Sequence, residues 1–77
     1  MNSKVKFLEI VLSDLISYRD TLELELNRVL NSDDKPIFNK KIDFDNLLGK
    51  VVENNNKIKM LGEYMTILNS DLNNNND

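Results

Sequence analysis

The chain has 77 residues, a formal net charge of −3 at pH 7, and neither cysteine nor histidine. One hydrophobic core in so short a chain contributes only about 3–5 kcal/mol, so such chains usually gain stability from disulfides, a structural metal or other chains. Disulfides are excluded without cysteine, and a zinc site would lack both of its favoured ligand types. Association with other chains is therefore the expected source of stability.

The first half of the chain repeats apolar residues at alternating steps of four and three, which is the spacing of one face of an α-helix. Among the inner positions of this stripe only Arg19 is polar. Ser3 is a suitable N-cap, and the polar residues before Pro36 favour termination there. We therefore predict a helix over residues 3–31. Its stripe consists of Met1, Val5, Leu8, Leu12, Leu15, Arg19, Leu22, Leu26, Val29 and Asp33.

Residues 32–43 are predicted to form the connection between two helices, and this length is unusual for a helical hairpin. Its apolar residues, Ile37, Phe38 and Ile42, suggest that the connection folds back over the end of the bundle. A small β-hairpin closing over residues 39–41 is the alternative.

A second stripe at steps of three and four predicts a helix over residues 44–72. Asp43 or Asp45 would cap its first turn, where a carboxylate also suits the helix dipole. Gly49 and the asparagines at 54–56 weaken this helix, so a break there is the alternative. The stripe keeps its phase through the asparagines, which favours one continuous helix. Its positions are Phe44, Leu47, Val51, Asn54, Ile58, Leu61, Met65, Leu68 and Leu72.

The last segment, residues 73–77, is rich in asparagine, and we predict that it is disordered. Frequent asparagine and lysine are typical of AT-rich genomes, such as those of low-GC bacteria and their phages. We find no export signal and no apolar run long enough for a membrane span. The chain is therefore expected in the cytoplasm of a bacterium or of a phage host, with no membrane partner.

Both predicted helices carry more apolar residues than one seam can bury. The residues 1–72 are thus predicted to form an all-α antiparallel hairpin with coiled-coil-like heptad seams, which dimerises into a four-helix bundle. Arg19 and Asn54 would lie level if the chain reverses near Pro36, and a polar pair there would fix the register. In the alternative, Arg19 lays its stem over the seam and keeps its charge in water. The predicted contact between chains comprises Phe7, Ile10, Val11 and Ile16.

The sequence offers little reactive chemistry. Histidine and cysteine are absent, the two glycines are isolated, and the paired carboxylates are typical of solvated helix surface. We therefore expect no enzymatic activity, no cofactor and no metal site. An aromatic ring beside a cation can bind a nucleotide, which makes four residues candidate ligand contacts. They are Tyr18, Arg19, Lys57 and Tyr64.

Three hypotheses of function follow. The first is a non-enzymatic adaptor or inhibitor, encoded by a phage or mobile element, that binds and modulates a larger protein. The second is a helical oligomer that binds a small anionic ligand or nucleotide signal between protomers. The third is a nucleic-acid-binding bundle, against which the acidic balance argues, because phosphate neutralisation requires a basic face.

Overall fold

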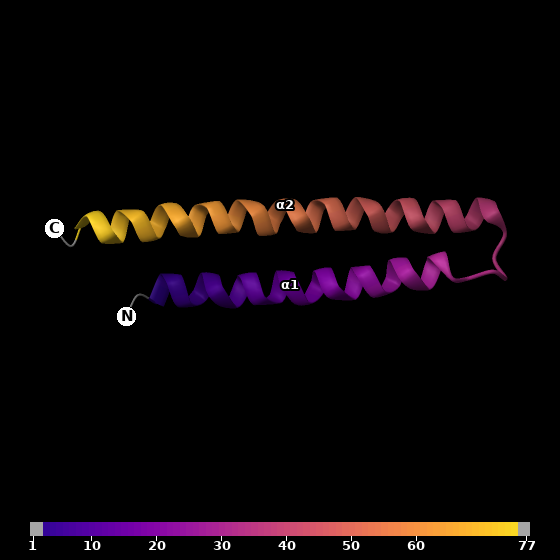
Figure 1. Ribbon diagram of the computed structural model, residues 1–77, viewed down its shortest axis with the longest axis horizontal. Coiled ribbons are helices and arrows are strands. Elements are labelled where there is room, and N and C mark those ends of the chain that lie inside the picture. The colour runs from indigo at the N-terminus through magenta and orange to yellow at the C-terminus, as the bar shows by residue number, and fades with distance from the viewer. Residues whose placement is uncertain (1–2, 76–77) are drawn as a thin grey trace.

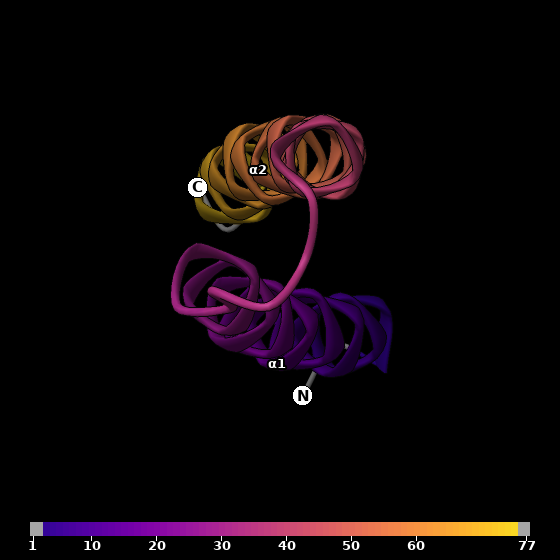
Figure 2. The ribbon, with the colours of Figure 1, turned by 90° about the vertical axis from the view of Figure 1, so that its right-hand side faces the viewer.

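The computed structural model describes the backbone of residues 3–75 and the side chains of residues 3–70. This part of the chain folds into two helices, α1 (Ser3–Leu30) and α2 (Ile37–Asn75), and contains no strand. The helices run antiparallel, side by side (Figure 1). Viewed from the connection, they form a single pair with no third element on either side (Figure 2). The predicted all-α helical hairpin is confirmed.

Helix α1 follows the predicted boundaries and turns its stripe towards α2. Every stripe position that the structure describes in α1, from Val5 to Val29, is buried or half-buried. Ser32 ends the helix, because its N–H and its hydroxyl both donate to the Val29 carbonyl, at 3.1 and 2.7 Å. Lys40 of α2 donates from Nζ to the Leu30 carbonyl at 2.9 Å, which places a cation at the negative end of the α1 dipole.

The connection is shorter than predicted, because α2 begins at Ile37 and not at residue 44. Pro36 initiates the helix: its fixed φ suits a helix start, and its carbonyl accepts the first helical hydrogen bond, from the Lys40 N–H at 3.0 Å. Lys35 Nζ lies 2.8 Å from Asp43 Oδ2, which ties the connection to the side of α2.

Four expectations about this region are therefore wrong. The predicted loop over residues 32–43 includes the first two turns of α2, and the alternative β-hairpin over residues 39–41 does not form. Neither Asp43 nor Asp45 is an N-cap, since both lie inside α2. The apolar residues Ile37 and Phe38 do not cover the end of the bundle, because 79% and 71% of their surfaces are exposed.

Helix α2 is continuous through residues 54–56, so the alternative break is also wrong. Its stripe from Phe44 to Leu68 is buried or half-buried at every position. The helix passes the predicted end at 72 and includes the first three residues of segment 73–77, because asparagine costs a helix only about 0.7 kcal/mol per residue and no proline intervenes. The remaining predicted tail residues, 76 and 77, lie outside the described part of the chain.

The core of the hairpin is minimal. Among the side chains that the structure describes, only Leu22, Val29 and Asn54 are buried. The molecule measures 62 × 16 × 12 Å, and its radius of gyration of 17.9 Å far exceeds the value of about 11.5 Å for a compact chain of this length. Its accessible surface is 6128 Å², whereas a compact monomer of 8.9 kDa exposes about 4,800 Å². One hairpin therefore leaves on the order of 1,300 Å² of surplus surface.

Candidate interaction surfaces

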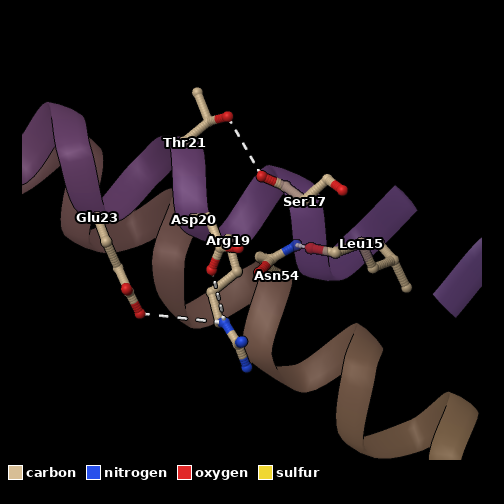
Figure 3. A network of polar contacts seen from close by, with 7 residues as sticks. All are labelled: Leu15, Ser17, Arg19, Asp20, Thr21, Glu23 and Asn54. Atoms are coloured by element: carbon tan, nitrogen blue, oxygen red, sulfur yellow. Dashed lines mark hydrogen bonds and ion pairs between the residues drawn. The ribbon is translucent and has the colours of Figure 1, made fainter. Parts of the chain in front are cut away.

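A buried polar side chain interrupts the apolar seam halfway along the hairpin. Asn54 of α2 is 2% exposed, and its Nδ2 donates to the Leu15 carbonyl of α1 at 3.1 Å (Figure 3). Its Oδ1 is buried and accepts no hydrogen bond from the described residues. A buried acceptor without a donor costs about 1–3 kcal/mol. Asn54 thus fixes which turn of α1 faces it, at a cost in stability.

Arg19 keeps its charge at the surface, as the alternative interpretation predicted. Its side chain is 39% exposed, and its Nε lies 3.7 Å from Asp20 Oδ1 and 4.0 Å from Glu23 Oε1 (Figure 3). Asn54 contacts Leu15, which lies one turn before Arg19 on α1. The predicted polar pair between Arg19 and Asn54 therefore does not form, and Asn54 instead contacts the backbone of α1.

Two adjoining apolar depressions lie where α2 leaves the connection. The first has a volume of about 370 Å³ and the second about 270 Å³. Lys41 and Asp45 border both and stand between them. We call this region the loop-end surface. Its other lining residues are Leu30, Ile37, Lys40, Phe44 and Leu48 in the first depression, and Phe38, Ile42 and Asn46 in the second.

A third depression, of about 330 Å³, lies at the opposite end of the hairpin. Phe7 and Tyr64, 63% and 55% exposed, are its large apolar side chains. We call this region the terminal-end surface. Its residues are Ser3, Lys4, Phe7, Leu8, Tyr64 and Leu68.

The predicted chain contact does not form one continuous face. Phe7 and Ile10 are exposed, while Val11 and Ile16 are half-buried at the edges of the seam. At about 100° of rotation per residue, Ile16 lies about 180° around α1 from Phe7. A single flat partner therefore cannot cover both, although each residue remains accessible to a contact of its own.

The four candidate ligand residues do not converge either. Tyr18 and Lys57 line a small depression of about 140 Å³, whereas Tyr64 belongs to the terminal-end surface and Arg19 is paired within α1. Lys57 Nζ lies 3.2 Å from Glu53 Oε1, so its charge is also engaged. Over the described residues, no group of three acidic side chains is placed to hold a metal ion. Neither helix, over the same residues, has an apolar stretch long enough to cross a membrane.

The sequence does not predict the loop-end surface, because the predicted connection contains five of its residues: Ile37, Phe38, Lys40, Lys41 and Ile42. The signal was present: Ile37 precedes Phe44 by seven residues, so it continues the second stripe by one heptad. Pro36 obscures it, because a proline is compatible both with the end of one helix and with the beginning of the next.

Comparison of the chain with protein-family models, curated proteins and solved structures found no match.

Proposed function

We propose that the chain is a non-enzymatic interaction protein of the cytoplasm of a bacterium or phage host. Two hairpins associate through their apolar surfaces into a four-helix bundle, and the assembled protein binds and modulates a larger protein. Such a protein acts as an adaptor or inhibitor, and it needs only a complementary shape and an apolar surface to bind its partner.

The exposed apolar surface carries this proposal. Soluble monomers rarely expose contiguous apolar patches beyond a few hundred Å². The surplus of about 1,300 Å² on each copy exceeds the roughly 800 Å² per partner that a stable protein–protein interface buries, so it suffices for association and leaves apolar surface for a larger protein. The exposed large apolar residues are Phe7, Ile10, Tyr18, Leu24, Leu30, Ile37, Phe38, Ile42, Leu48, Val52, Met60, Tyr64 and Ile67.

Sedimentation equilibrium combined with thermal unfolding tests the association. In an obligate dimer, folding and association are one equilibrium, so Tm rises with protein concentration. We expect a mass of twice 8.9 kDa, and a Tm that increases across a hundredfold range of concentration. A well-folded monomer with a Tm independent of concentration would overturn the proposal.

Binding of a larger protein is tested by retention from a low-GC bacterial lysate on the immobilised chain. We expect the same protein to be retained repeatedly, and to be lost with Phe7→Glu, which places a charge in the terminal-end surface. Thr21→Glu is the matched control, because it adds the same charge to an exposed position of α1 outside that surface. Repeated retention of no protein, or equal retention by both variants, contradicts this part of the proposal.

A further inference from the structure

The loop-end surface combines an apolar area with two opposite charges. Lys41 and Asp45 are one helical turn apart on α2, and neither forms a hydrogen bond or ion pair with the described residues. The neighbouring charged residues have partners within the hairpin. Lys35 forms an ion pair with Asp43, and Lys40 donates a hydrogen bond to the Leu30 carbonyl. One unpaired cation and one unpaired anion thus stand between two apolar depressions.

We propose that the loop-end surface is the contact with a second copy of this chain. The two α2 helices run antiparallel across a two-fold axis near position 43, and Lys41 of each copy pairs with Asp45 of the other. This inference rests on the proposed association and specifies its geometry.

The sequence of α2 is self-complementary about this axis. In an antiparallel pair related by a two-fold axis, residues equidistant from the axis face each other. Lys41 then meets Asp45, so this ion pair forms twice by symmetry. Phe38 and Leu48 are also equidistant from the axis, so these apolar side chains lie level with each other across the contact.

The charge pattern favours a second copy over an unrelated partner. In an isologous contact the same patch lies on both sides of the interface, so a patch with charges of one sign repels its own copy. A patch that carries a cation and an anion on opposite sides of the two-fold axis attracts its own copy. Lys41 and Asp45 meet this condition with their net charge of zero. In the overlap, the ends of both hairpins pack as a short four-helix bundle, and the terminal-end surface of each copy points away from the contact.

Charge-reversal variants test the pairing. Lys41→Glu and Asp45→Lys each convert two attractive pairs into two repulsive ones, because the axis repeats every change. We expect either variant alone to raise the dimer dissociation constant at least tenfold, measured by sedimentation equilibrium at about 50 mM salt, where screening is weak. An equimolar mixture of the two variants should restore the dimer, since every new charge then faces an opposite one. The double variant Lys41→Glu/Asp45→Lys should also dimerise.

Lys59→Glu is the matched control. It makes the same substitution on α2, with Glu63 one turn later in place of Asp45, outside the loop-end surface. Its dimer should equal that of the unmodified chain. Recovery in the mixture also shows that the single variants are able to fold.

The outcomes separate this inference from the proposed function. If the unmodified chain dimerises and the charge reversals leave that dimer unchanged, the inference is overturned while the association stands. If the single variants dissociate but the mixture does not recover, the charges do not pair with each other and the inference also fails. An unmodified chain that is monomeric overturns both.

Discussion

Replacing Asn54 by leucine should stabilise the protein. The amide is 2% exposed and forms one hydrogen bond, at 3.1 Å to the Leu15 carbonyl, while its Oδ1 has no donor among the described residues. Leucine has a similar size and shape, so it fits the same space in the seam without a polar atom.

The magnitude follows from three contributions. Burying a leucine side chain contributes about 1.5–3 kcal/mol. Removing an unpaired buried acceptor relieves about 1–3 kcal/mol, and losing the hydrogen bond to Leu15 costs about 0.5–1.5 kcal/mol. Part of the gain is lost to imperfect packing, so we expect a net increase of about 1–3 kcal/mol in the free energy of unfolding. For a chain of this size, each kcal/mol raises Tm by about 4–8 °C.

Thermal unfolding followed by far-UV circular dichroism, at one fixed chain concentration, measures this effect. Asn56→Leu is the control, because Asn56 is exposed and should change the stability by no more than about 0.5 kcal/mol. A lower Tm for Asn54→Leu would refute the reasoning, because relief of the unpaired acceptor and the added apolar burial would then not outweigh the lost hydrogen bond and imperfect packing. Loss of a single oligomeric species in the same variant would show that Asn54 also selects the register.

Two further changes probe the packing and the connection. Leu22→Ala should cost about 2–5 kcal/mol in chemical unfolding, because Leu22 is 3% exposed and its removal leaves a cavity; Leu24→Ala, at an exposed position, should cost little. The hydrogen bond and the charge of Asp43 raise the pKa of Lys35 above its ordinary value of 10.5. The ion pair therefore stabilises the fold fully at pH values below 10.5, and this stabilisation is lost as the pH rises through the higher pKa of the folded state. The small difference in Tm between the unmodified chain and Lys35→Met at pH 8 should therefore vanish in strongly alkaline solution, and a difference that persists there contradicts the ion pair.

The seams were predictable because helix periodicity records which face is buried. Every stripe position from Val5 to Val29 in α1 and from Phe44 to Leu68 in α2 is buried or half-buried, including the two polar interruptions, Arg19 and Asn54. Side chains three and four residues apart necessarily share one face of a helix, whatever lies opposite. A pattern of this kind is a property of one helix alone, and no knowledge of the partner is needed to find it.

The start of α2 and the register between the helices were harder to predict. Pro36 is compatible both with the end of one helix and with the beginning of another. The hydrogen bond that its carbonyl accepts from the Lys40 N–H shows that it begins α2. The shorter connection then moves α2 relative to α1, so Asn54 meets Leu15 one turn away from Arg19. Register depends on the path of the connection and on backbone carbonyls, and neither is recorded in the spacing of apolar residues.

The position of the buried residues also bears on where a second copy would add stability. Leu22 and Val29, the two buried apolar side chains among those that the structure describes, both lie in the half of α1 nearer the connection. Asn54 interrupts the seam beyond them, and its unpaired oxygen weakens the middle of the hairpin. A copy docked on the loop-end surface would cover Leu30 and Leu48 beside the existing core and so enlarge one continuous apolar cluster. A copy docked at the other end would instead begin a second cluster, separated from the first by a buried polar residue, and would gain less cooperative stability from the same buried area.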